Sequence, residues 1–107
     1  MINCTGVIVA IYRNGEFETL EPSGPAAHLI EMRSDPYEVD GVSYRDLSIV
    51  GIRNLPEKTS ELLVVDKEVA IYGWSIGRDD LIYLDGRMVK NNDGKIVASH
   101  NLIKLAK

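Results

Sequence analysis

The chain has 107 residues, of which 45% are apolar and 26% are charged, and its formal net charge is −4. This length predicts one domain over residues 1–107, and the composition is that of a folded protein. The acidic balance argues against a nucleic-acid-binding protein, because binding to phosphates depends on a positive surface. With one cysteine, no membrane-length apolar segment and no export leader, we expect a cytoplasmic protein without a membrane partner.

The first half of the chain is predicted to consist of β-hairpins. Residues 7–12 and 17–20 are strand-like and flank Asn14-Gly15, a dipeptide typical of two-residue hairpin turns. The Pro-Ser-Gly-Pro sequence over residues 22–25 predicts a tight, rigid turn, because proline fixes φ and glycine permits positive φ. Further strands are predicted over residues 26–32, 37–39, 42–45 and 47–52, with a second hairpin turn at Asp40-Gly41 and a surface loop over residues 53–60.

The second half is arranged around a strand, a short helix and a strand. Residues 62–65 are an unbroken apolar run, typical of a strand buried on both faces. Asp66 is placed to cap a helix over residues 67–75 with its carboxylate, and Gly77 is placed to end that helix. The helix is expected to turn Val69, Ala70, Tyr72 and Trp74 partly inward. After the helix we predict a strand over residues 81–84, a turn at Asp85-Gly86, and a hairpin of residues 88–90 and 95–98 around residues 91–94. The tail over residues 101–105 is expected either to dock as a last strand or to pair with another chain.

Together these elements predict an α+β fold that is mostly antiparallel. We expect a hairpin-rich, strongly curved sheet or a small open barrel with one short helix, because hairpins place neighbouring strands side by side. A domain this small gains a concave site most easily at a subunit boundary, so we also expect a homo-oligomer.

Several short motifs occur in a recognisable order along nearly the whole chain. They are Asn3-Cys4-Thr5, the Pro-Ser-Gly turn, Leu55-Pro56, Arg-Asp-Asp-Leu over residues 78–81 and Asp-Gly-Lys-Ile-Val over residues 93–97. In this order the chain resembles a family of short phage and bacterial proteins of unknown function. Members usually begin with Asn-Leu-Thr-Pro-His-Pro-Val, whereas this chain has Gly6, Val7 and Ile8, so no role of that histidine carries over. The resemblance implies a phage-associated cytoplasmic protein and no particular reaction.

Two segments are candidates for binding an anion. In the first, Ser23 and Gly24 present backbone amides and His28 adds a donor; the alternative is a structural turn. In the second, Arg78 grips a phosphate or carboxylate beside Asp79 and Asp80; the alternative is that Arg78 forms an ion pair and one aspartate binds local amides. Trp74 is a candidate stacking surface for a nucleobase, with a core role as the alternative.

We expect no metal, no cofactor and no catalytic residue set. The two histidines and one cysteine lack metal-ligand spacing, and the sequence has no phosphate-binding loop, dinucleotide fingerprint or nucleophile elbow. The main hypothesis is therefore a phage-type, non-catalytic, oligomeric sponge that sequesters a small anionic ligand, such as a host cyclic nucleotide immune signal. The alternatives are a small nucleotide-cleaving hydrolase that uses Asp79, Asp80 and a histidine, and an interaction or structural module that pairs through its edge strands.

Overall fold

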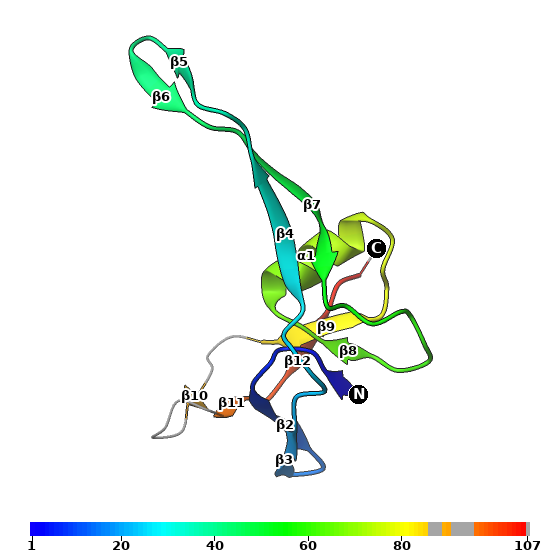
Figure 1. Cartoon of the computed structure of the whole chain (residues 1–107). Helices are drawn as coiled ribbons and strands as arrows, with labels where there is room; N and C mark the ends of the chain where they lie inside the picture. Colours follow the sequence, from blue (N-terminus) through cyan, green and yellow to red (C-terminus); the bar gives the residue numbers. More distant parts are fainter. Residues whose placement is uncertain (86–88, 91–95, 107) are drawn as a thin grey trace.

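The computed structural model of the chain describes residues 1–85, 89–90 and 96–106. In these residues the fold is mostly β with one short helix, so the predicted α+β class is confirmed. A two-stranded extension, which we call the arm and define as residues 28–53, projects from the rest, which we call the body (Figure 1). The extents of 57 × 34 × 26 Å reflect this projection. The elements are β1 (Ile2–Asn3), β2 (Ile8–Arg13), β3 (Glu16–Leu20), β4 (His28–Arg33), β5 (Tyr37–Val39), β6 (Val42–Tyr44), β7 (Leu47–Arg53), β8 (Leu63–Val64), α1 (Lys67–Ser75), β9 (Leu81–Leu84), β10 (Val89–Lys90), β11 (Ile96–Ser99) and β12 (Leu102–Lys104).

The first body sheet has the strand order β1-β8-β9-β12 and contains the predicted strand, helix and strand. β8 runs parallel to both neighbours, with Leu63 opposite Ile2 on β1 and opposite Leu81 on β9. Helix α1 makes the crossover between β8 and β9 that a parallel pair needs. β12 pairs antiparallel with β9, so the prediction that the tail docks as a last strand is confirmed.

The second body sheet has the strand order β10-β11-β2-β3 and contains the first predicted hairpin. β2 and β3 pair up to Arg13 opposite Glu16. The two turn residues have positive φ, 53° at Asn14 and 85° at Gly15, as a hairpin turn of this type requires. β11 pairs antiparallel with β10 and parallel with β2. The predicted positions Gly86, Met88, Lys95 and 91–94 lie outside the described residues.

Helix α1 has the predicted bounds, but the predicted side-chain cap is wrong. Asp66 has extended N-cap angles, φ −69° and ψ 155°, yet its carboxylate bonds to no amide of the described helix. The Asp66 backbone carbonyl instead accepts the bond from Ala70 N at 3.0 Å. Desolvation and the charge of Glu68 raise the pKa of the Asp66 carboxyl, because no donor offsets them. Gly77 ends the helix with φ 97°, as predicted.

The core lies between α1 and the first body sheet. Val69 and Ala70 of α1 and Leu63 of β8 are each no more than 2% exposed. Tyr72 and Trp74 are half-buried, so the prediction that they turn partly inward is confirmed. The core residues are Cys4, Ala27, Leu63, Val65, Val69, Ala70 and Leu81.

The predicted single curved sheet or small open barrel is replaced by four small sheets. Two have four strands and two have two strands, and among the described residues none closes into a barrel. The reason is that the arm strands pair with one another, β4 with β7 and β5 with β6, instead of extending a body sheet. The parallel pairs β1-β8, β8-β9 and β2-β11 also join segments that no hairpin connects.

The arm consists of a long ladder and a short hairpin beyond it. β4 and β7 pair antiparallel with a register shift between Ile30 and Glu31, which leaves Val50 as the additional residue of a β-bulge. β5 and β6 form the hairpin at the far end, and we call residues 34–46 the tip. Positive φ at Asp40 and Gly41, 52° and 80°, confirms the second predicted hairpin turn.

Candidate functional site

Arg78 follows α1, and Asp80 and the loop before β8 hold its guanidinium. Nε donates to Asp80 Oδ1 at 2.9 Å and Nη2 donates to Asp80 Oδ2 at 2.8 Å, a two-pronged geometry that suits guanidinium and carboxylate. Nη2 also donates to the Pro56 carbonyl at 3.0 Å. The Asp80 side chain is 5% exposed, and the bonds from Arg78 lower the pKa of its carboxyl. This is the ion pair of the structural alternative, and it neutralises the Arg78 charge locally.

Asp79 and Asp80 point to different partners. The exposed Asp79 carboxylate forms an ion pair with Lys58, and this interaction lowers the pKa of the Asp79 carboxyl. The positive charge of Lys104 on β12 acts in the same direction. Because neighbouring residues of an extended chain point opposite ways, the two carboxylates do not converge on one position.

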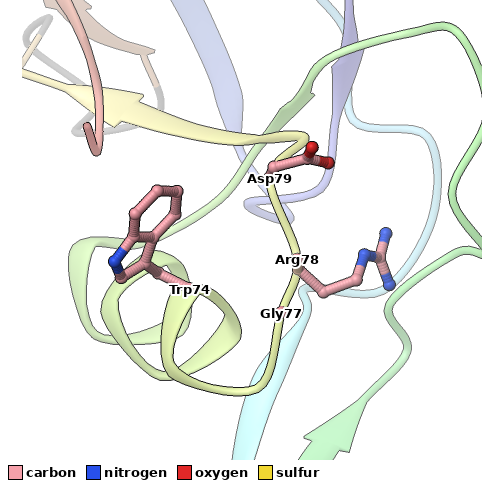
Figure 2. A pocket seen from close by; sticks show the side chains of 4 residues that line it. All are labelled: Trp74, Gly77, Arg78 and Asp79. Atoms are coloured by element: carbon pink, nitrogen blue, oxygen red, sulfur yellow. The ribbon is translucent and has the colours of Figure 1, made fainter. Parts of the chain in front are cut away.

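A shallow hollow lies between the end of α1 and the following segment. Its volume is about 130 Å³, and it is lined by Trp74, Gly77, Arg78 and Asp79. In Figure 2 the Arg78 guanidinium points away from the Trp74 indole. The hollow is therefore walled by an aromatic ring and backbone, with a carboxylate at its rim. It is smaller than the roughly 300 Å³ at which pockets for small molecules begin.

Asn3 holds the Pro-Ser-Gly turn. The Ser23 amide and the Ser23 hydroxyl both donate to the Asn3 carbonyl, at 2.9 and 3.0 Å. Gly24 is exposed, and its φ lies outside the left-handed region, so the turn does not use the freedom that glycine offers. The turn thus directs both Ser23 donors into the protein.

A buried hydrogen-bond network explains the Asn-x-Thr motif. The Asn3 side chain belongs to a residue only 2% exposed, and its amide donates to the carbonyls of Val7 and Leu20 at 2.6 and 2.9 Å. Its oxygen accepts from the Thr5 amide at 3.0 Å and the Thr5 hydroxyl at 2.6 Å. A buried amide with every bonding position satisfied stabilises a loop, and this motif therefore has a structural role.

The two histidines lie in different surroundings. His28 is exposed at the start of β4, and its Nδ1 is 3.1 Å from the Ala26 carbonyl oxygen. His100 packs against the rings of Tyr12 and Phe17, with centroid distances of 4.9 and 5.1 Å. Among the described residues, no group of three His, Cys, Asp or Glu side chains is arranged to hold a metal ion.

The predicted binding residues therefore form two groups. Trp74, Arg78, Asp79 and Asp80 surround the end of α1, whereas Ser23, Gly24 and His28 belong to the turn and the strand after it. The buried thiol of Cys4 is close to both groups. Cys4 Sγ is 4.0 Å from Ser23 Oγ, and the charge of Arg78 lowers the pKa of the thiol whereas the charge of Asp80 raises it. Burial raises the pKa of this thiol.

A group of exposed apolar side chains lies on the tip, which the sequence predictions did not single out. Tyr37 lies directly opposite Tyr44, and Val39 lies directly opposite Val42. Residues at i and i+2 share a face, so all four side chains lie on one face, which we call the tip face. They are 44% to 51% exposed, and the two tyrosine rings are stacked with centroids 6.0 Å apart.

A sequence signal for this surface exists in the alternation on either side of Asp40-Gly41. The pattern Tyr-Glu-Val before the turn and Val-Ser-Tyr after it puts the apolar residues on one face and Glu38 and Ser43 on the other. Such alternation normally indicates a half-buried strand. No other described element of the chain covers the tip face, and this second fact requires coordinates.

Comparison with known proteins gives no assignment. No family model, no curated protein and no solved structure matches the chain. No described helix has the length and apolar character needed to cross a membrane.

Proposed function

We propose that the chain is a non-catalytic assembly module that docks through the tip face. The observation that carries the proposal is the uncovered apolar face of Tyr37, Val39, Val42 and Tyr44 at the end of a projecting arm (Figure 1).

The tip face costs stability unless another surface covers it. A two-stranded hairpin is at best marginally stable in water, and it normally needs a third strand or a packed layer on its apolar side. The opposite face, with Glu38 and Ser43, is suited to solvent. Exposed aromatic and β-branched residues gathered on one face are typical of interaction sites.

Hydrogen bonds among Ser34, Tyr37 and Asp46 join the two ends of the tip. The Ser34 amide donates to the Asp46 carbonyl at 2.9 Å, and the Asp46 amide donates to the Ser34 hydroxyl at 2.8 Å. The Tyr37 hydroxyl donates to Asp46 Oδ1 at 2.6 Å, and this bond raises the pKa of the Tyr37 phenol. These bonds close the base of the hairpin and preorganise its apolar face, which lowers the entropy lost on docking.

A pair of conservative substitutions tests the proposal. Val39→Thr with Val42→Thr keeps the β-branched shape but places hydroxyl groups on the tip face. We expect a lower mass in sedimentation at a given concentration, or loss of partner capture, with an unchanged circular dichroism spectrum. Val7→Thr is the matched control, because Val7 is 41% exposed but lies on the body. Unchanged association of the double variant would contradict the proposal.

The oligomeric sponge for a small anionic ligand is a second proposal, which the surroundings of the hollow support. The Trp74 indole offers a stacking surface, and Lys58 and Lys104 both lie near enough to lower the pKa of Asp79. If a nucleobase stacks on the indole, we expect Lys58 and Lys104 to bind the nucleotide's phosphate. Arg78 is not expected to bind it, because Asp80 already neutralises its charge. The hollow is small, so a neighbouring copy would have to complete the site.

The test of the second proposal is a thermal shift screen with cyclic and linear nucleotides, followed by recovery of the ligand. Binding to the folded state at 100 times Kd raises the free energy of unfolding by about 2.7 kcal/mol. Lys104→Gln should remove the shift, whereas Lys67→Gln, a control on the first turn of α1, should not. Recovery of unaltered nucleotide supports a sponge, and recovery of product would support the hydrolase. The lowered pKa values of Asp79 and Asp80 do not favour general acid catalysis near neutral pH.

A further inference from the structure

We infer that the partner docked on the tip face is a basic protein surface with a small apolar patch at its centre. The inference rests on the proposed function and names the chemistry of the partner. The tip face supplies the apolar contact, and the charged residues around it select the sign of the partner's charge.

Most of the net charge of the chain lies in the tip. The charged residues of the tip are Asp35, Glu38, Asp40, Asp46 and Arg45, which give a net charge of −3. The rest of the chain has eleven lysines and arginines and twelve aspartates and glutamates, a net charge of −1. A short segment at the end of the arm therefore carries three of the four net negative charges of the protein.

The tip carboxylates keep their charge in the described structure. Among the described residues, all carboxylates that form ion pairs lie outside the tip, and they are Glu18, Glu31, Glu61, Asp79 and Asp80. Asp46 accepts a bond from the Tyr37 hydroxyl, which is neutral and leaves the negative charge in place. The charge of the tip is therefore available to an external cation.

The tip carboxylates lie around the tip face and not on it. Asp40 occupies the turn next to Val39, and Asp46 lies at the base of the hairpin, where it bonds to Tyr37. Glu38 lies on the opposite face of the hairpin. An apolar centre with a polar rim is the usual anatomy of a protein interface. The complementary surface has an apolar patch with lysines or arginines around it.

The same charge argues against three other occupants of the tip face. The phosphates of nucleic acids and the headgroups of anionic lipids are negative, so the tip would repel both. A second copy of the chain would bring a further net charge of −3 to the contact. A basic protein surface is attracted by this charge instead.

The small size of the tip face predicts a transient contact. Its four half-exposed side chains are far fewer than the roughly 20 to 30 residues that each side of a standard interface contributes. Rim charges of opposite sign mainly raise the association rate constant. The contact should therefore form quickly, dissociate quickly and weaken as salt is added.

Four immobilised peptides test the inference with the whole chain in solution. The centre of each peptide is Val-Ser-Val or Ser-Ser-Ser, and two lysines or two glutamates flank this centre on each side, so that charge and apolar content vary independently. In biolayer interferometry at low salt, the Kd for the lysine-valine peptide should be at least about tenfold lower than for the other three. Added sodium chloride should raise this Kd.

A charge variant and a matched control locate the attraction. Glu38→Gln with Asp40→Asn removes two tip charges and keeps the side-chain shapes, and asparagine tolerates the positive φ at this position. Glu21→Gln with Glu57→Gln changes the net charge equally but alters exposed residues of the body. The tip variant should lower the association rate constant for the lysine-valine peptide about five- to tenfold, whereas the control should change it less than about twofold.

Each outcome decides a different statement. Failure of the lysine-valine peptide to bind more tightly than the glutamate-valine peptide would overturn the basic partner. Equal effects of the two charge variants would assign the attraction to net charge alone and would also overturn it. If either result came with loss of association in the Val39→Thr and Val42→Thr variant, the tip face would remain the docking surface. If that variant also associated normally, the proposed function would fall too. A Trp74 fluorescence melt verifies that each variant is folded.

Discussion

Replacing Arg78 by methionine should destabilise the fold, because it removes the partner of a buried carboxylate. The Asp80 side chain is 5% exposed and accepts two bonds from Arg78, while a third bond from Arg78 reaches the Pro56 carbonyl. Removing one partner of a fully buried pair costs about 3 to 5 kcal/mol. The Arg78 side chain is 21% exposed, so water reaches part of the site and we expect about 2 to 4 kcal/mol.

The measurement is urea unfolding followed by circular dichroism and Trp74 fluorescence. A chain of this length has a total stability on the order of 5 to 15 kcal/mol, so the loss should be a large fraction of it. The double variant Arg78→Met with Asp80→Leu removes both charges and should recover to within about 1 kcal/mol of the original, because replacing a buried pair by apolar groups is often neutral. The difference between the two variants isolates the cost of the unpaired carboxylate.

The structural role of Arg78 would be refuted by a different pattern. If Arg78→Met unfolded at the same urea concentration as the original but lost a nucleotide-induced thermal shift, the guanidinium would act on a ligand and not on Asp80. If both variants were equally unstable, the aliphatic part of Arg78 and the bond to Pro56 would account for the loss instead.

Three further predictions concern the same region. Asp66→Ala should change the free energy of unfolding by less than about 0.5 kcal/mol, because the carboxylate caps no amide, whereas a working cap is worth about 1 kcal/mol; chemical denaturation measures the difference. Gly73→Ala should cost about 1 to 2 kcal/mol in the same assay, since its Cβ would overlap Leu81 Cδ1 and the gain in helix propensity offsets only part of the strain. The folded-state pKa of Asp80 is lowered, so its contribution is present above its unfolded pKa of about 3.9 and is lost as pH falls below it. Asp80→Asn should flatten the decrease in stability below about pH 4, seen in acid titration by circular dichroism, and an unchanged slope would contradict this.

Local sequence signals predicted the secondary structure because they act over a few residues. The Asn14-Gly15 and Asp40-Gly41 turns, the bounds of α1 and the Gly77 stop all depend on φ preferences and short-range bonds. The arrangement of sheets was not predicted, because β1, which pairs with β8, and β11, which pairs with β2, lie far from their partners in the sequence. The Asp40-Gly41 turn predicted the pairing of β5 with β6, but no turn signal indicated that β4 pairs with β7 and not with a body strand.

The candidate site shows the same limit. That Arg78 forms an ion pair was foreseen as an alternative, but its partner, Asp80, was not named from the sequence. That Asn3 would take both donors of Ser23 was not foreseen, because the turn and Asn3 meet only after the chain has folded back. The sequence therefore identifies residues with suitable chemistry, whereas their partners decide whether that chemistry is free for a ligand.

The contrast between body and tip favours the tip as the functional surface. In the body, Asn3, Arg78 and Asp80 all have bonding partners, and Val69 and Ala70 of α1 are covered, whereas Ile71 is a single exposed apolar residue on the helix. The tip has the same kinds of turn residues and strand alternation as the body hairpin, yet no other described element packs on its apolar face. Natural proteins break one or two of the rules of folding mainly at functional sites. Here the polar groups named above follow the rules, and the exception is the exposed apolar face of the tip. In the proposed function a partner surface supplies the missing cover. Replacing one methyl group of Val39 and of Val42 by a hydroxyl group tests that requirement while leaving the body contacts intact.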